Sequence, residues 1–598
     1  MSCTELGLLA PALLTLAVAV VCVRVVVLVV RLLGPRPPRS RTALVVGRQV
    51  ARDPSTLNPA IVLAAGLALA VFAGQVQALA LRNADLRARA VAGADTVLHV
   101  RVAPGVDLID AVDAADPTGR HAMAVQEKAA SYDSGTSRIV AVDAPRFRAV
   151  TSWSPDWADV TEVASALRPG LSAPVVLHGD SITVAFHDLR VSESPDAAAL
   201  PGAGTSSVPP PPDLAVVVES PLGAWETEIL GPMTLGDGKV SGPLDDHEKP
   251  HQPPPCRKGC RLVALLLTSG TDAVTAVSFT VTGVSTDRDA ASTSTRWLTA
   301  PGWHERTGDR DEAPDPDSVA TALPSDDGLA VSAPFVTSGS QTFLVPGDTS
   351  DVLPAVFAPT TTTQPLPGRD GVVAGTGLDG QSQQLESAGR AATLPRALGD
   401  GVLVDLRNAA GRTEPRTSEA TSDVWLAEDR PPDLEQKLVA AGLTVTSRDT
   451  LTETRERQRN QPAYRGAVVA LTVAAAALLL GLLTLLTARL TEASPRRAIW
   501  RSLREAGFRR SALWRLAFVE TALPAVLGTV VGAVSGVLTA QLAAPRLPLV
   551  DTSAAGPPLD LRLAWPPLVL LTALTLVLVL VVAGIVAASE SRPVRGRG

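Results

Sequence analysis

The chain has 598 residues, of which 46% are hydrophobic, and its formal net charge is −7. It is too long for one ordinary domain and too apolar for a purely soluble protein, so part of it belongs in lipid. The charge is unevenly divided: residues 1–81 and 466–598 together carry 20 Lys+Arg against 8 Asp+Glu, whereas residues 82–465 carry 33 against 52. The acidic middle argues against nucleic acid as a partner, and the basic ends fit contact with anionic membrane lipid.

A helix that crosses the hydrocarbon core, which is about 30 Å thick, needs about 20 mostly apolar residues. Four windows meet this standard: Pro59–Leu81, Gly466–Ala488, Leu516–Leu542 and Trp565–Ala588. A fifth, Leu8–Val30, contains Arg24 near one end, where a long side chain can reach the membrane surface. A cleaved signal peptide is the alternative, but residues 1–8 lack the basic region with which such peptides begin. We therefore predict five spans, with residues 1–33 forming the first and residues 59–81 the second.

The short loops between these spans indicate a direction, because cytoplasmic loops of membrane proteins are enriched in Lys and Arg. Five Arg fall in residues 34–58, eight in residues 489–515 and three after Ser591, whereas residues 543–563 balance two Arg with two Asp. We therefore predict a multi-pass protein of the cell membrane with its N-terminus outside and its C-terminus in the cytoplasm. Residues 34–58 then form a cytoplasmic loop, and residues 82–465 lie outside.

Residues 82–465 alternate β-like runs with turn-rich stretches. The runs are rich in β-branched residues and lie at 96–102, 174–179, 181–187 and 276–284. Stretches rich in Pro, Gly, Ser and Asp indicate loops or linkers and lie at 194–213, 235–255, 305–327 and 358–370. We predict a β-rich part over residues 95–420, built as a sandwich.

The end of this region changes character. Residues 424–446 have the pattern strand, helix, strand, with Gly442 where a helix C-cap is expected, so we predict a small α/β unit at 421–449. The polar residues 450–465 are predicted to form a stalk leading into the third span, and residues 75–90 can do the same above the second. The predicted fold class is a polytopic α-helical membrane protein of about five spans with a large, β-rich α+β extracytoplasmic domain.

His247-Glu248-Lys249-Pro250-His251 matches the HExxH pattern, in which two His bind zinc and Glu acts as the base. Pro250 lies inside the turn that must be helical, and three Pro follow at 253–255, so we predict a solvated loop and no metal site. The sequence also lacks a GxxxxGK[ST] phosphate loop, a GxSxG elbow and a dinucleotide fingerprint. We therefore expect no cofactor and no catalytic residues.

Cys256 and Cys260 lie in CysArgLysGlyCys on the predicted outer side, where an oxidising compartment permits a short-loop disulfide. Two free thiols are the alternative, and a metal site would lack two further obvious ligands.

The fourth predicted span carries Gly528, Gly532 and Gly536 on one face. Such a stripe lets another helix approach closely in lipid, although Gly is also generally frequent in membrane helices. Glu520 lies one turn into the same span and is costly in lipid unless it is paired, for which Arg515 is a candidate. The preceding segment, Thr491–Leu513, favours an amphipathic helix after Pro495; it can lie on phospholipid or dock a cytoplasmic partner.

This basic segment ends in LeuArgGluAlaGly at 503–507 and is followed by Glu520 and the Gly stripe. The arrangement resembles FtsX-like, MacB-type ABC transporter permeases, in which a basic coupling helix ends in a Leu-x-x-Ala-Gly turn before a Glu-containing, Gly-rich span. The matching positions are Arg497, Leu503, Arg504, Ala506, Gly507, Arg515 and Glu520. Residues 43–54 resemble the elbow helix of that family.

The resemblance implies a three-span FtsX-like permease domain at 466–598, with a coupling helix at 491–511 that binds a separate cytoplasmic ABC ATPase. The implied contact residues are Arg497, Arg501, Leu503, Arg504, Gly507, Arg509 and Arg510. Further implied partners are membrane lipid and a second permease unit or homodimer partner. The extra first span resembles the last helix of a preceding similar unit, so the chain resembles the C-terminal half of a long actinobacterial permease.

By resemblance, the chain is an ABC permease subunit that couples ATP hydrolysis by its partner to motion of the outer domain, for export or extraction of lipid, lipoprotein or peptide. A non-transport membrane receptor or scaffold that binds a cell-envelope ligand is the alternative. A membrane-tethered hydrolase is a further one, but no catalytic set supports it.

Overall fold

A computed structural model describes residues 58–104, 106–132, 135–168, 174–193, 210–220, 225–244, 256, 259–269, 275–288, 298, 302–306, 319–336, 341–348, 350, 352–361, 364–365, 371–380, 382–410, 420–505, 509–544 and 556–591. Of the first 57 residues it describes only Leu13, Ala17, Val18, Val20, Val21 and Arg24. The predicted elbow helix, the HExxH match and, apart from those six positions, the predicted first span therefore lie outside the described residues.

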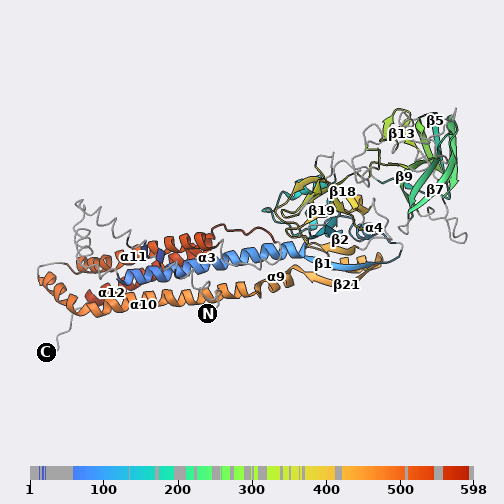
Figure 1. The fold of residues 1–598 in the computed structure, drawn as a ribbon. Helices are drawn as coiled ribbons and strands as arrows, with labels where there is room; N and C mark the ends of the chain where they lie inside the picture. The colour runs from blue at the N-terminus through green and yellow to red at the C-terminus, as the bar shows by residue number, and fades with distance from the viewer. Residues whose placement is uncertain are drawn as a thin grey trace. The chain divides into compact units, whose positions relative to one another are not determined.

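The chain divides into two compact units (Figure 1). The helical unit comprises residues 1–86, 455–554 and 559–598, and the β-rich unit comprises residues 87–454 and 555–558. The basic, apolar parts of the sequence thus make up one unit, and the acidic middle makes up the other.

The described part of the helical unit contains four long apolar helices. They are α3 (Asn58–Ala92), α10 (Pro462–Glu505), α11 (Arg510–Ala543) and α12 (Trp565–Ser591). The segments long and apolar enough to cross a bilayer are Pro59–Ala92, Tyr464–Thr491, Leu513–Ala543 and Trp565–Ser589. Each contains one of the four strongest predicted windows. A short polar helix, α9 (Leu451–Arg459), precedes α10 within the predicted stalk.

A ten-stranded mixed sheet forms one part of the β-rich unit. Its order is β16-β17-β18-β15-β19-β3-β2-β20-β1-β21, with the β15–β18 and β19–β3 pairs parallel and the other pairs antiparallel. Helices α4, α7 and α8 share a core with one face, and α5 and α6 share a core with the other.

The strands of this sheet are β1 (Thr96–Val102), β2 (Ala122–Tyr132), β3 (Gly135–Val142), β15 (Leu353–Phe357), β16 (Gln364–Pro365), β17 (Val372–Thr376), β18 (Ser382–Arg390), β19 (Gly401–Asp405), β20 (Thr421–Leu426) and β21 (Leu443–Thr450). The helices are α4 (Leu108–Ala115), α5 (Ala144–Val150), α6 (Val160–Leu167), α7 (Leu406–Ala410) and α8 (Leu434–Ala440). Asp107 and Asp159 cap α4 and α6 by accepting from the N–H groups of the first turn, which fixes where these helices begin.

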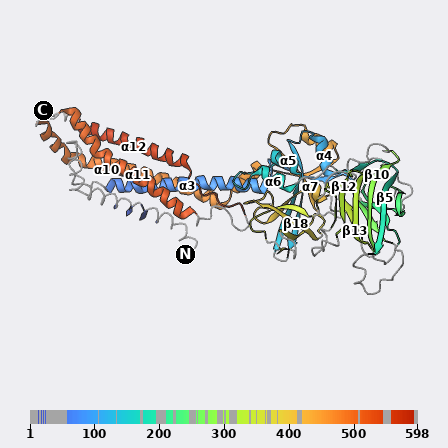
Figure 2. The same cartoon turned by 90° about the horizontal axis from the view of Figure 1, so that it is seen from above.

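Between α6 and β15 the chain forms a β-sandwich. One sheet has the order β12-β13-β10-β5-β8, and the other has β11-β14-β9-β6-β7 with β4 paired to β9. Figure 2 shows β12, β13, β10 and β5 as neighbours. Inward residues of both sheets, such as Ile182, Phe279 and Leu265, share one core.

The strands of the sandwich are β4 (Val176–Leu177), β5 (Ser181–Glu193), β6 (Asp213–Glu219), β7 (Trp225–Pro232), β8 (Gly236–Pro243), β9 (Cys260–Thr268), β10 (Thr275–Thr286), β11 (His304–Glu305), β12 (Thr321–Ser325), β13 (Gly328–Val336) and β14 (Thr342–Val345).

The described strands of the predicted β-rich part therefore belong to two assemblies, the ten-stranded sheet and the sandwich. Only the strands between residues 176 and 345 form the predicted sandwich. The strand–helix–strand segment predicted at 421–449 is present as β20, α8 and β21. Strands β20 and β21 flank β1, so this segment is part of the ten-stranded sheet. The prediction of a loop over 235–255 is wrong at 236–243, because this Gly-rich stretch pairs with β5 as strand β8 and the pairing overrides its low strand propensity.

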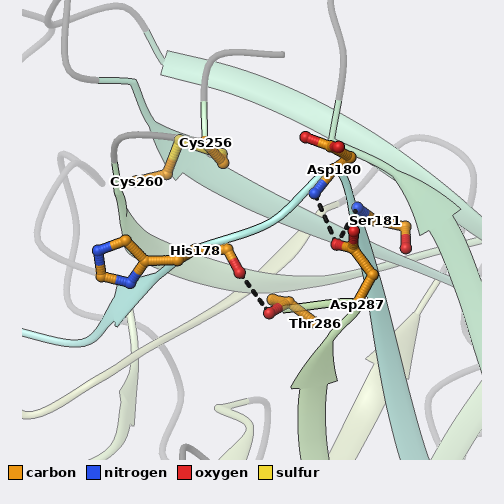
Figure 3. The surroundings of a disulfide bond; sticks show 7 residues. All are labelled: His178, Asp180, Ser181, Cys256, Cys260, Thr286 and Asp287. Atoms are coloured by element: carbon orange, nitrogen blue, oxygen red, sulfur yellow. Dashed lines mark hydrogen bonds between the residues drawn. A yellow bond between two sulfur atoms is a disulfide. The ribbon is translucent and has the colours of Figure 1, made fainter. Parts of the chain in front are cut away.

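A disulfide joins Cys256 to Cys260 at the start of β9 (Figure 3). Both residues are fully buried in the sandwich core. The backbone N–H groups of Gly179 and Gly259 donate to the Cys256 carbonyl oxygen at 3.2 and 3.1 Å. The bond therefore lies in a hydrogen-bonded turn that fastens the segment before β9 to the end of β4.

The neighbouring turn is closed by Asp287 (Figure 3). Its carboxylate accepts hydrogen bonds from the backbone N–H groups of Asp180 and Ser181 at 2.6 and 3.1 Å. These bonds lower the pKa of Asp287, because they favour the ionised form. The end of β10 is thus fixed to the beginning of β5.

We expect replacement of both cysteines by alanine to loosen this end of the sandwich. The closed loop is short, with a sequence separation of 4, and chain-entropy estimates for such a loop give about 2 kcal/mol of stabilisation. Amide exchange in β4 and β9 should therefore accelerate by about thirtyfold in Cys256→Ala/Cys260→Ala. Hydrogen–deuterium exchange with mass spectrometry on the full chain measures this effect.

Reductant provides the matched control for the disulfide. Reduced wild type should exchange like the double variant, and the variant should not respond to reductant. Unchanged exchange in the variant would show that the bond does not stabilise this end of the sandwich.

Candidate functional site in the helical unit

Helix α3 is the most enclosed of the four candidate spans. Of its best apolar window, 72% is buried, against 28% for α10, 61% for α11 and 22% for α12. Leu63, Leu67 and Val71 are fully buried and share a core with residues of the other three helices. Helix α3, which is far in sequence from α10, α11 and α12, therefore forms the centre of the described bundle.

Three glycines of α11 lie against the backbone of α3. A Cβ added to Gly528 or Gly532 would stand 2.7 or 2.6 Å from the carbonyl oxygen of Ala60 or Ala64. The third glycine, Gly536, would place it 2.7 Å from the corresponding oxygen of Ala68. Real Cβ atoms essentially never approach so closely, so only Gly fits at these positions.

The opposite face of α3 meets α10 in the same way. A Cβ added to Gly66 would stand 2.8 Å from the Ala477 carbonyl oxygen, and one added to Gly481 would stand 3.1 Å from the Leu63 Cα. Small residues thus allow backbone contact on two sides of α3. In lipid, where apolar surface gains nothing from leaving water, such close packing holds helices together.

Two amide side chains of α3 hold the extended segment before α12. Gln75 donates from Nε2 to the Ala564 carbonyl oxygen at 2.7 Å, and the Ala564 N–H donates back to Gln75 Oε1 at 3.0 Å. Asn83 makes the same reciprocal pair with the backbone of Asp560, at 3.0 and 2.8 Å. Among the described residues no strand pairs with this extended backbone, and each amide supplies the donor and acceptor that such a strand would provide.

The spacing of these pairs follows from backbone geometry. Eight residues of helix rise about 12 Å, and four residues of extended chain cover about 13 Å, so side chains two turns apart on the helix meet peptide groups four residues apart in the extended segment. Gln75 and Asn83 are 1% and 3% exposed. Neither residue is singled out by the sequence analysis, although a Gln in the middle of an apolar window is a signal that could have found it.

Ion pairs accompany this contact within the helical unit. Arg82 Nη1 lies 3.0 Å from Asp560 Oδ2, and Arg455 Nε of α9 lies 2.6 Å from Asp85 Oδ1. The first pair adds a charged contact between α3 and the extended segment, and the second joins α3 to α9. Both are partly exposed, so each contributes modestly to stability.

A buried arginine marks the other end of the bundle. Arg489 of α10 is 2% exposed, and its Nη2 lies 3.5 Å from the backbone oxygen of Glu520 on α11. Sequence analysis names Arg515 as a candidate partner for Glu520, and Arg515 is exposed. Arg489 meets the same turn of α11 through the backbone oxygen of Glu520. It directly follows the predicted window Gly466–Ala488, and a basic residue at the end of a span is the signal for it.

The predicted ATPase contacts that the structure describes lie at the end of α10 and at the start of α11. The backbone of α10 continues as helix through Glu505, so Arg497, Arg501, Leu503 and Arg504 are helical positions. Gly507 lies outside the described residues. Arg509 is the N-cap residue of α11 and Arg510 its first residue, and both are exposed.

Four apolar helices of membrane-spanning length and a large β-rich unit define a multi-pass membrane protein with a β-rich domain. Residues 468–592 match the family described as FtsX-like permease C-terminal. This part of the chain, from within α10 to the end of α12, is therefore an FtsX-like permease C-terminal domain, and this family is a transporter component. No curated protein matches the chain.

We expect Gly532→Ala to destabilise the helical unit. The new Cβ would lie 2.6 Å from the Ala64 carbonyl oxygen, so α11 must move away from α3. Overpacking of this kind costs about 1–3 kcal/mol. Thermal or SDS-induced unfolding of the purified full chain would show the loss.

Gly584→Ala is the matched control, because a Cβ at this α12 position meets nothing within 4 Å. It should be neutral or stabilise by up to about 1 kcal/mol through helix propensity. Equal effects of the two substitutions would show that close contact between α3 and α11 does not hold the bundle.

We expect Asn83→Leu to release the segment before α12. The substitution leaves the N–H and C=O of Asp560 without the amide that binds them, at a cost of about 1–3 kcal/mol for each buried unpaired group. Exchange of the amides of 559–564 should accelerate by at least about tenfold. Gln77→Leu, at a half-buried amide on the same helix, should leave this exchange unchanged, and a similar response to both variants would refute a specific role for Asn83.

Proposed function

We propose that the chain is the permease subunit of an ABC transporter of the FtsX/MacB type. In this proposal a separate cytoplasmic ATPase binds the coupling segment 491–511, and ATP hydrolysis moves the extracytoplasmic domain. The work done is export or extraction of lipid, lipoprotein or peptide. The match of residues 468–592 to FtsX-like permeases, whose members generally work with a cytoplasmic ATPase, carries the proposal.

The packing of this domain supports a mechanical role. Residues 528–536 of α11 meet α3 through backbone contact, so movement of α11 would be passed directly to α3. The chain continues from α3 into β1, and from β21 through α9 into α10. Strands β1 and β21 are neighbours in one sheet, so relative movement of α3 and α10 would act on this strand pair.

Charge at the start of α11 supports an acidic partner. Arg509 and Arg510 are exposed at a helix N-terminus, where the helix dipole favours anions and disfavours cations. Two arginines at this position therefore suit an acidic surface outside the chain. The other predicted contacts, Arg497, Arg501, Leu503 and Arg504, lie on the last turns of α10 just before them.

The proposed orientation has the N-terminus and the β-rich unit outside the cell membrane and the C-terminus in the cytoplasm. The disulfide is consistent with an extracytoplasmic β-rich unit, because such bonds persist in oxidising compartments. Apolar side chains of α10 and α12 that are more than half exposed would face membrane lipid or a second permease unit, and they include Val469, Val473, Leu480, Val569, Leu570 and Val577.

Charge reversal in the coupling segment tests the proposal. The tagged protein should co-purify with an ABC ATPase from its own cells in mild detergent, and the variant Arg501→Glu/Arg504→Glu/Arg509→Glu should lose it. Reversal of paired interface charges costs several kcal/mol, so recovery should fall by more than about tenfold. Quantitative mass spectrometry of the eluates, normalised to the permease, measures the change.

The matched control reverses three exposed arginines elsewhere, as Arg101→Glu/Arg390→Glu/Arg459→Glu, and should retain the ATPase. Absence of any ATPase with wild type, or its full retention by the coupling-segment variant, would overturn the proposal. The receptor or scaffold function would then be favoured.

A further inference from the structure

His99 lies between two carboxyl groups in the ten-stranded sheet. It is on β1, directly opposite Asp423 of β20, and its Nδ1 is 2.7 Å from Asp423 Oδ1. Its Nε2 is 3.3 Å from Asp449 Oδ2 on β21. One imidazole therefore connects three neighbouring strands through side chains.

A bulge shapes this site. The pairing of β1 with β21 shifts between His99 and Val100, and the extra residue, Thr446, donates from Oγ1 to the His99 carbonyl oxygen at 3.0 Å. Bulges redirect side chains and are common near functional sites. Here the register shift lies directly beside His99, whose imidazole lies between the carboxyl groups of Asp423 and Asp449.

Further charged groups surround the buried carboxyl of Asp423, which is 1% exposed. Arg396 holds Glu127 at 2.6 Å and lies 3.8 Å from Asp423 Oδ2, beyond hydrogen-bond distance. Arg138 lies 3.2 Å from the other oxygen of Glu127. The charged groups around His99 are thus Asp423 on β20, Asp449 on β21, Glu127 on β2, Arg138 on β3, Arg396 in the loop before β19 and Arg101 two residues along β1.

The cluster also reaches the end of α3. The backbone N–H of Arg396 donates to the Ala90 carbonyl oxygen at 2.7 Å, and Arg396 adopts a left-handed conformation with φ 65°. Such a conformation is costly for a residue other than Gly and is retained where the surroundings hold it. Within the β-rich unit, contacts therefore run from the last turn of α3 through Arg396, Asp423 and His99 to β21, the strand that leads into α9.

For both carboxyl contacts of His99 to be hydrogen bonds, the site needs one additional proton. A neutral imidazole has one N–H donor, and an ionised carboxyl has none. With His99 neutral and both carboxyls ionised, one of the two contacts is a hydrogen bond and the other brings lone pairs together. One more proton, on the imidazole or on Asp423, makes both contacts hydrogen bonds.

The environment favours uptake of that proton in mild acid. Burial, with the Glu127 charge, raises the pKa of Asp423 from 3.8 to about 6, against the opposing effects of His99 and Arg396. Because the folded state holds this proton more tightly than the unfolded chain, the stabilisation is complete below pH 3.8 and is lost as the pH rises through about 6.

We propose that His99, Asp423 and Asp449 form a proton-operated clamp, which takes up one proton in mildly acidic surroundings and then fastens β1 to both β20 and β21. Since β1 continues from α3 and β21 leads into α9, the clamp would set how firmly the two strands connected to these helices are joined to each other. This regulatory meaning rests on the proposed permease function, whereas the clamp itself does not.

Hydrogen–deuterium exchange of β21 in the purified full chain tests the clamp without any ATPase, so its outcome is independent of the co-purification result. Exchange rates are divided by the intrinsic amide rates at each pH. In wild type, protection of residues 443–450 should rise by about tenfold between about pH 7.5 and pH 5. No rise over this range would overturn the proposal.

Two variants remove the need for the proton. In Asp449→Asn the new amide can donate to Nε2 of a neutral His99, so protection at about pH 7.5 should approach the acid value and the response should shrink below about threefold. Asp449 is 39% exposed, so this variant is expected to fold. In His99→Gln/Asp423→Asn the imidazole and the buried carboxyl are both gone, and the response should disappear.

His121→Gln is the matched control. The His121 side chain is 23% exposed, close to the 27% of His99, and its Nδ1 lies 3.6 Å from a single carboxyl group, that of Asp429. This variant should keep the full response of wild type. A wild-type response in Asp449→Asn, or its loss in His121→Gln, would show that the pH dependence does not arise at His99.

Discussion

Backbone contact between α3 and its neighbours is the constraint on which the helical unit depends. Water release cannot drive helices together in lipid, so association needs dense packing and hydrogen bonds. Gly528, Gly532 and Gly536 supply the packing at a spacing of four residues, and they meet the carbonyl groups of Ala60, Ala64 and Ala68 at the same spacing. Because the contacts repeat every four residues on both helices, they form a continuous interface along α3 and α11. It fixes the register of α11 against α3 and leaves the outer faces of α10 and α12 apolar and exposed.

A second constraint is that extended backbone packed beside such a bundle must find hydrogen-bond partners. Residues 559–564 have no neighbouring strand among the described residues, and Gln75 and Asn83 replace one by presenting a donor and an acceptor each. Because both amides lie on α3, the same helix that carries the glycine contacts also positions the segment before α12. The long helix α3 therefore contacts α10 and α11 directly and also holds the segment that leads into α12.

Local sequence rules predict the elements that depend on nearby residues. Apolar length predicts the four described candidate spans, Gly spacing predicts a close helix contact, and the strand–helix–strand pattern near Gly442 predicts β20, α8 and β21. The same rules do not predict that β1 pairs with β20 and β21, because these strands lie more than 300 residues away in the sequence. They also miss β8, where Gly and Pro suggest a loop, and the clamp at His99, whose three residues come from three strands.

The joint between α3 and β1 shows why the arrangement of these distant strands matters. Gly93 ends the helix with φ +82°, and a Cβ there would stand 2.7 Å from the ring of Trp425 on β20. The Gly93 carbonyl oxygen accepts from the Ser152 N–H at 2.9 Å and from Thr151 Oγ1 at 3.1 Å. The Arg396 N–H holds the preceding turn at Ala90.

Within the β-rich unit, the last turn of α3 is therefore held by several neighbouring segments. For the proposed permease, movement of α3 would then reach β1 undiminished, and the yielding contact would be the one between β1 and β21. That contact is partly made through His99, whose second hydrogen bond depends on a proton. In this proposal the contacts at Gly93 and the proton-dependent contact at His99 have complementary roles: the first would pass displacement into the sheet, and the second would set how firmly β21 follows it.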